Sequence, residues 1–126
     1  MIKGRILQLG FRWLAIAALL VLIDGFPVLT IAQPAPKRIE ITASQFSFSP
    51  GEITLKKGQP VLLVLKSQDV PHGLRVRELN VAVKVNEHGT AQIQFTPQKT
   101  GDFVGHCYVF CGKGHGSMVF TFHVVN

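Results

Sequence analysis

The chain has 126 residues, which is room for one small domain, and 47% of them are hydrophobic against 16% charged. This balance favours a packed core and excludes a chain that is disordered throughout. From residue 33 onward, 10 Lys or Arg stand against 6 Asp or Glu, and the cations are scattered without interleaved aromatic residues. Nucleic acid is therefore not an expected partner.

The N-terminus has the pattern of an export segment. Basic residues among the first twelve lead into the apolar run Trp13–Ile23. This run falls within the roughly 7 to 15 residues of a signal-peptide core and is shorter than the roughly 18 of a membrane span. We expect residues 1–32 to be cleaved just before Gln33. An uncleaved membrane anchor is the alternative, because Val28–Ala32 extends the apolar stretch.

After this segment the sequence predicts a short linker and one β-rich domain. Residues 33–37 contain two prolines and form the expected linker, and residues 38–126 form the expected domain. The domain consists of short apolar or alternating stretches separated by turn residues. The strand-like positions are Ile39 and Ile41 continued by Phe46 and Phe48, then Ile53 and Leu55, Val61–Leu65, Val81–Val85, Ala91–Phe95 and Met118–Val124.

Three details of this pattern carry structural predictions. Val61–Leu65 is a continuous β-prone run, which is typical of a central strand. Glu87-His88-Gly89 is expected to close a hairpin. Met118 shares its parity with the apolar residues of the last strand, so its sulfur is expected to point inward. Seven or eight short strands in about 90 residues predict an all-β domain, a Greek-key β-sandwich.

The residues that carry chemistry are concentrated in one loop. Cys107, Cys111, His115 and Met118 lie within twelve residues, and four glycines between positions 105 and 116 disfavour a helix. A tightly folded backbone there lets side chains three and four apart converge on one point. We therefore interpret this stretch as a ligand loop.

The donors in this loop favour copper. Thiolate, thioether and imidazole are the ligands that copper takes in electron-transfer sites, whereas magnesium and calcium prefer oxygen. Zinc remains an alternative, although a structural zinc site has no use for Met118. A further imidazole is offered by His72 in Asp69-Val-Pro-His-Gly, which we expect to be a loop made rigid by Pro71. His72 and the ligand loop are expected to meet at one end of the sandwich.

The combination of Asp-x-x-His-Gly with Cys-x-x-x-Cys-Gly-x-Gly-His-x-x-Met resembles the cupredoxin superfamily, and within it the dinuclear copper A domain of cytochrome c oxidase subunit II and nitrous oxide reductase. The resemblance runs from about Ile39 to the C-terminus. It implies two copper ions bridged by both cysteines and capped by both histidines. It also implies that Met118 and the carbonyl of Val109 are weak ligands, and that the function is one-electron transfer.

The resemblance also sets expectations for partners and location. It implies a redox partner such as a c-type cytochrome or an oxidase subunit, in the periplasm or on the outer face of the plasma membrane. Val109 stands where the oxidase pattern usually has a Glu, and the single Trp, Trp13, lies in the export segment instead of an aromatic patch. These departures favour a soluble or singly anchored relative over a terminal-oxidase subunit. The chain alone is not expected to be an enzyme, because it lacks a hydrolase or transferase motif.

Several alternatives remain open at this stage. A mononuclear blue-copper site needs only His72, Cys111, His115 and Met118. A copper-delivery protein would bind the ion without shuttling electrons, and a structural disulfide is the default for two exported cysteines. Outside this set, we assign no metal role to His88, His106 or His123. We interpret Phe103, Tyr108 and Phe110 as an apolar shell around the site or as simple packing. Arg75, Arg77 and Lys113 are interpreted as solvated surface charge.

Overall fold

The computed structural model describes residues 27–126, and Pro34–Asn126 form a compact unit. The apolar run of the expected export segment lies outside the described residues. Within residues 27–126, no helix has both the length and the apolar character needed to cross a membrane. The first strand begins at Lys37, one residue before the start predicted for the domain.

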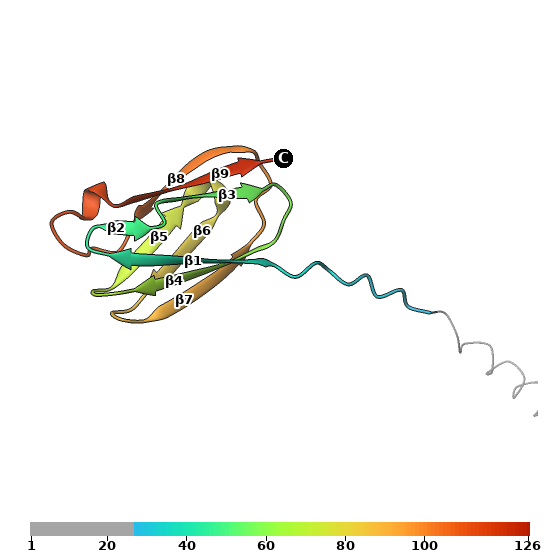
Figure 1. The fold of residues 1–126 in the computed structure, drawn as a ribbon, viewed down its shortest axis with the longest axis horizontal. Helices are drawn as coiled ribbons and strands as arrows, with labels where there is room; N and C mark the ends of the chain where they lie inside the picture. The colour runs from blue at the N-terminus through green and yellow to red at the C-terminus, as the bar shows by residue number, and fades with distance from the viewer. Residues whose placement is uncertain (1–26) are drawn as a thin grey trace, which may run out of the picture. The chain divides into compact units, whose positions relative to one another are not determined.

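The regular secondary structure of the described chain is almost entirely β-strand (Figure 1). The helical elements of residues 27–126 are two single turns of 3₁₀-helix, η1 (Arg77–Leu79) and η2 (His115–Ser117). The strands are β1 (Lys37–Ser44), β2 (Ser47–Ser49), β3 (Glu52–Lys56), β4 (Val61–Ser67), β5 (His72–Val76), β6 (Val81–Val85), β7 (Thr90–Phe95), β8 (Gly101–Cys107) and β9 (Val119–Val125).

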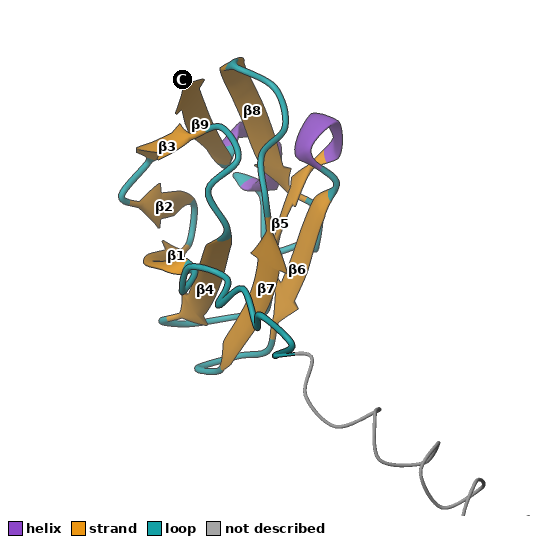
Figure 2. Ribbon diagram, turned by 90° about the vertical axis from the view of Figure 1, so that its right-hand side faces the viewer, coloured by secondary structure: helices purple, strands orange, loops and turns teal. Residues whose placement is uncertain are grey.

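These strands form two sheets with the expected all-β sandwich architecture (Figure 2). The four-stranded sheet has the order β2-β1-β4-β7, and the five-stranded sheet has the order β3-β9-β8-β5-β6. The β1–β4 and β3–β9 pairs are parallel, and the other pairs are antiparallel. As predicted, β4 is an interior strand, and four of its apolar residues are buried.

The core follows from the alternation of the strands. In β9, Phe120, Phe122 and Val124 are buried, and Met118 immediately before the strand is 1% exposed. This confirms the predicted parity. Phe120 and Phe122 pack edge to face at 4.7 Å between ring centroids, and Phe48 reaches Phe120 from the other sheet at 6.1 Å. The core therefore extends along β9 to the residue that precedes it.

The structure corrects three local predictions. Phe46 does not continue the first strand, because β1 ends at Ser44 and the chain turns before β2 pairs back on it. His72 is not a loop residue but opens β5. The turn at residues 87–89 does not close a hairpin, because β6 pairs with β5 whereas β7 pairs with β4. This turn instead carries the chain from one sheet to the other. The apolar pattern of two successive strands does not show whether they belong to the same sheet.

An ion cluster on the outer face of β9 predicts a pH-dependent stability. His123 Nδ1 lies 2.6 Å from Asp102 Oδ1, and its Nε2 lies 3.3 Å from Glu52 Oε2. Hydrogen bonds to Asp102 and then to Glu52 raise the pKa of His123. Its stabilising contribution is therefore complete below the unfolded value of about 6.5 and is lost as pH rises through the folded pKa.

Comparing wild type with His123→Gln by urea unfolding between about pH 5.5 and 8.5 measures this contribution. We expect the two free energies of unfolding to differ most at the acidic end and to converge as the pH rises. Contributions from the other titratable groups cancel in the difference. A difference that stays constant across this range would contradict the proposed imidazolium.

Candidate metal centre

Three segments supply the predicted ligands, and strand pairing brings them to one end of the sandwich (Figure 1). His72 is the first residue of β5 and Cys107 is the last of β8, and these strands pair with Leu74 opposite Cys107. Residues 108–118 then loop out and return to β9. The backbone N–H of Cys107 donates to the carbonyl of Met118 at 3.1 Å, which closes the base of this loop.

The two cysteines are buried, free thiols. Their sulfurs lie 3.8 Å apart, well beyond the roughly 2.05 Å of a disulfide bond. The structure therefore does not contain the disulfide that was the default alternative. The thiol of Cys107 also lies 3.2 Å from the carbonyl oxygen of Val109, so this backbone oxygen faces the sulfur pair.

Cys111 is at the centre of the cluster. Its Sγ lies 3.7 Å from Nδ1 of His115 and 3.8 Å from Sδ of Met118. Burial, followed by the neighbouring Cys107 and the charge of Asp69, raises the pKa of the Cys111 thiol to about 11. Cys111 is therefore a protonated thiol at neutral pH, and a metal ion that binds it must displace the proton.

His72 completes the set from the other strand. It is fully buried, and one of its ring nitrogens lies within 4.8 Å of both cysteine sulfurs, which are also within that distance of each other. Its Nε2 lies 2.6 Å from Oδ1 of Asp69, whereas its Nδ1 is buried without a hydrogen-bond partner. An unsatisfied buried nitrogen is costly unless something binds it. This nitrogen is the strongest single indication that the cluster binds a ligand.

Asp69 is itself held in place, so it can orient the imidazole. Oδ2 accepts a hydrogen bond from the backbone N–H of Gln45 at 2.8 Å, and Oδ1 accepts one from Val70 at 2.8 Å. Burial alone would raise the pKa of Asp69, but these N–H groups and the His72 ring hold it below its usual value. The carboxylate therefore accepts a hydrogen bond from Nε2–H and leaves the Nδ1 lone pair free for a metal.

A turn distant in sequence covers the ligand loop. A Cβ on Gly114 would lie 2.5 Å from the Phe46 ring, and one on Gly112, whose φ is +134°, would lie 2.8 Å from the same ring. The side-chain amide of Gln45 donates to the carbonyl of Cys111 at 2.6 Å. The glycines are therefore required for close packing of Phe46, and Gln45 and Phe46 fix the loop. Neither Gln45 nor Phe46 was predicted to belong to the site.

The aromatic residues expected to form an apolar shell do not act as one layer. Phe110 is 77% exposed at the loop tip, and its ring centroid lies 5.8 Å from that of His115. Tyr108 instead packs sideways against Gly73.

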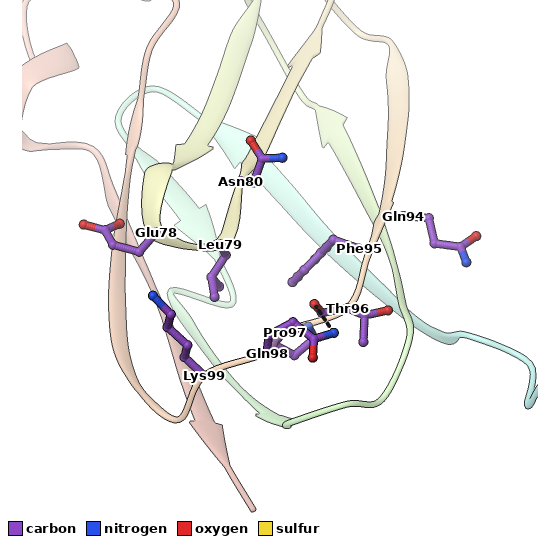
Figure 3. A pocket seen from close by; sticks show the side chains of 9 residues that line it. All are labelled: Glu78, Leu79, Asn80, Gln94, Phe95, Thr96, Pro97, Gln98 and Lys99. Carbon is purple, nitrogen blue, oxygen red and sulfur yellow. Dashed lines mark hydrogen bonds between the residues drawn. The ribbon is translucent and has the colours of Figure 1, made fainter.

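His88, His106 and His123 lie outside the cluster. A separate hollow of about 400 Å³, lined by residues 78–80 and 94–99, contains neither histidine nor cysteine (Figure 3).

The donor set fits a soft metal ion. The two thiols and the His72 imidazole form a buried group whose ligand atoms lie within 4.8 Å of one another, and the one nearby carboxylate is already engaged with His72. The half-buried imidazole of His115 and the buried thioether of Met118 contact this group through the Cys111 sulfur. Calcium and magnesium require several oxygen ligands, which the cluster does not offer. Copper in electron-transfer sites takes this combination of donors.

The family model of the cupredoxin-like domain matches residues 12–120. The chain belongs to the cupredoxin-like family. This cupredoxin-like chain is 27% identical over 97 residues to cytochrome c oxidase subunit 2 of Thermus thermophilus, covering 75% of this chain and 72% of the subunit. It is 37% identical over 84 residues to the nitrous-oxide reductase of Cupriavidus necator, covering 64% of this chain but only 13% of that protein.

Similarity to solved structures agrees with this family. A chain in the cryo-EM structure of a heme-copper terminal oxidase dimer is 26% identical, with a TM-score of 0.64 and coverage of 95% of this chain and 92% of that one. The cupredoxin-like chain thus resembles the copper A domain of oxidase subunit II, as its ligand-loop pattern indicated. Because it spans only a small part of the reductase, the whole activity of that protein does not transfer.

The orientation of His72 leads to a prediction for Asp69→Asn. We expect copper affinity to fall by about 10- to 100-fold, because a side-chain amide no longer fixes the proton on Nε2. Competition with a copper chelator measures the affinity, and the histidine NMR signals of the metal-free protein report the tautomer. Glu78→Gln, a carboxylate-to-amide change at an exposed position beyond the end of β5 opposite to His72, is the control. An unchanged tautomer with weakened affinity would contradict the positioning role.

Proposed function

We propose that this protein binds copper and transfers single electrons. The observation that carries the proposal is the buried, unpartnered Nδ1 of His72 beside two free thiols. These soft donors already lie close together, because the pairing of β5 with β8 brings them to one place. Rigid donors favour electron transfer, because ligand geometry then changes little between oxidation states.

Within this function we propose a centre of two copper ions. Cys107 and Cys111 would bridge the ions, His72 and His115 would each bind one, and Met118 and the Val109 carbonyl would be weak ligands. The proximity of the two sulfurs, 3.8 Å apart, supports a shared role. Copper would supply the one-electron redox chemistry. The protein would hold the donors, exclude water from the buried sulfurs and orient His72 through Asp69.

A mononuclear site is the second candidate, and the central position of Cys111 favours it. Its sulfur contacts both His115 and Met118. Copper stoichiometry and the electron paramagnetic resonance spectrum of the oxidised protein separate the candidates. Two ions sharing one spin give hyperfine splitting from both nuclei, whereas one ion gives splitting from one nucleus. One copper per chain with a localised spin would exclude the dinuclear proposal.

Copper delivery without electron transfer is the third candidate. A carrier of electrons retains its metal through repeated reduction and oxidation, whereas a delivery protein passes Cu(I) to an acceptor. Cycling the loaded protein beside a Cu(I) chelator distinguishes the two. We expect the copper content to stay constant over the cycles.

We also propose that residues 1–32 direct export and that the domain at residues 38–126 works in the periplasm or on the outer membrane face. Similarity to oxidase subunit 2 supports this location. The partner would be a redox protein such as a c-type cytochrome or an oxidase subunit. Mass spectrometry of the protein from the native host tests whether the N-terminus is cleaved near Gln33.

A further inference from the structure

A groove on the outer face of the five-stranded sheet is not explained by the metal centre. It has a volume of about 390 Å³ and lies where β5 and β8 pair, with Arg75 opposite His106. We call it the β5–β8 groove. Its lining residues are Arg75, Arg77, Glu78, Val104, His106 and Tyr108.

The groove contains two positive charges without an internal partner. The guanidinium carbon of Arg75 lies 4.2 Å from the centroid of the Tyr108 ring, which holds this cation in place. Among residues 27–126, neither Arg75 nor Arg77 forms an ion pair with a carboxylate, and this includes Glu78 in the same groove. Both guanidiniums are therefore available to an external anion.

These charges border an exposed apolar surface. Val104 on β8 is 48% exposed, and Val119 on β9, opposite His106, is 45% exposed. Protein interfaces combine apolar contact with charged groups that select the partner. A second hollow of about 370 Å³ also reaches Arg75 and Arg77. The area is therefore wider than a small anion requires and suits a carboxylate-bearing protein surface.

The groove also adjoins the metal centre through Tyr108. This residue follows Cys107, and its backbone N–H donates to the carbonyl of Gly73 at 3.2 Å. A Cβ on Gly73 would lie 2.7 Å from the Tyr108 ring, so the ring rests on the residue that follows His72. One wall of the groove is thus adjacent in sequence to a cysteine of the site and packed on the neighbour of a histidine.

We propose that the β5–β8 groove docks the carboxylate-rich face of a redox partner protein. The carboxylates would pair with Arg75 and Arg77, and apolar side chains would cover Val104 and Val119. This docking face lies on the flank of the sheet, apart from the loop tip where Phe110 is exposed. The redox purpose rests on the proposed function, whereas the docking itself does not require copper.

The first test maps anion binding on the reduced, metal-free full-length protein. Paramagnetic hexacyanochromate(III), a trivalent anion, broadens the NMR signals of nearby amides. We expect broadening centred on the backbone around Arg75 and His106. Broadening spread evenly over the exposed lysines, or centred elsewhere, would overturn the proposal.

Charge variants then test the arginines against a matched control. Arg75→Gln with Arg77→Gln should weaken hexacyanochromate binding by roughly tenfold at low ionic strength. Lys56→Gln with Lys57→Gln removes the same charge from exposed positions outside the groove and should have little effect. Arg75→Lys with Arg77→Lys should keep most of the binding. If both glutamine pairs weakened hexacyanochromate binding equally, net charge alone would explain the loss, and the proposal that the groove is the binding site would be refuted.

A protein probe separates partner docking from a small-anion site. We expect an acidic ferredoxin to shift the same amide signals, including those of Val104 and Val119, and a basic c-type cytochrome to leave them unchanged. Binding of hexacyanochromate without ferredoxin shifts would refute docking and indicate a small-anion site. Because these measurements use metal-free protein, failure of the copper proposal would show itself separately, as a lack of copper uptake.

Discussion

Replacing Cys111 by serine is expected to abolish stable copper binding altogether. The Cys111 sulfur contacts the Cys107 thiol, the His115 imidazole and the Met118 thioether, each within 3.8 Å. Both the dinuclear and the mononuclear arrangements therefore depend on it. A serine hydroxyl is a hard, protonated group at neutral pH and does not replace a thiolate toward copper.

Cys107→Ser is the matched control, because it makes the same atomic change in the same buried cluster. Within the described part of the chain, the Cys107 sulfur contacts the Val109 carbonyl and Cys111 but neither His115 nor Met118. We expect this variant to lose the second ion and the shared spin while keeping one copper, held by Cys111, His72, His115 and Met118. Copper per chain and the paramagnetic spectrum measure both variants.

The outcome separates a copper centre from a set of merely structural thiols. If Cys111→Ser still bound copper as tightly as wild type, the proposed ligand set would be wrong. Folding is checked independently by the NMR spectrum of the metal-free variants. Serine and cysteine have nearly the same volume, so we expect both variants to keep the native strand pairing.

Much of this site could be predicted from local sequence. The ligand loop has a short spacing, and its two sulfurs, imidazole and thioether converge as expected. The inward direction of Met118 follows from the period of two in β9, because alternate residues of a strand face the same side. Both inferences depend only on residues close together along the chain.

The remaining features depend on contacts between distant segments. Phe46 packs on Gly112 and Gly114, and Asp69 is fixed by the backbone of Gln45. No local pattern marks such a contact, because the partners are about 24 to 68 residues apart and meet only after the sheets pair. The strand β5 was missed for a different, local reason, because Pro71 just before it and Gly73 within it are residues typical of turns.

The groove shows the same limit for charged residues. Arg75 and Arg77 are typical of solvated surface in the sequence, and only the pairing of β5 with β8 places His106 and Tyr108 beside Arg75. The arrangement of these charges, and not their number, is what suits the groove to an anionic partner. Composition alone cannot distinguish scattered cations from a groove with two unpaired guanidiniums.

The second large effect concerns the core that supports the site. Phe120→Ala is expected to lower the free energy of unfolding by about 3 to 5 kcal/mol. The Phe120 ring is fully buried and packs against Phe48 and Phe122, so alanine leaves a cavity between the sheets. Small domains have only about 5 to 15 kcal/mol of stability. The variant should therefore be close to unfolding at moderate temperature.

Urea unfolding of the metal-free protein measures this loss, and Phe110→Ala is the control. Phe110 is the same residue type but is 77% exposed, so its removal should change stability by less than about 0.5 kcal/mol. Copper should restore part of the stability of Phe120→Ala, since a ligand that binds only the folded state shifts the equilibrium toward it. Equal losses in the two variants would contradict the core described for β9. Absence of stabilisation by copper would contradict a site that forms only when β5, β8 and the ligand loop are assembled.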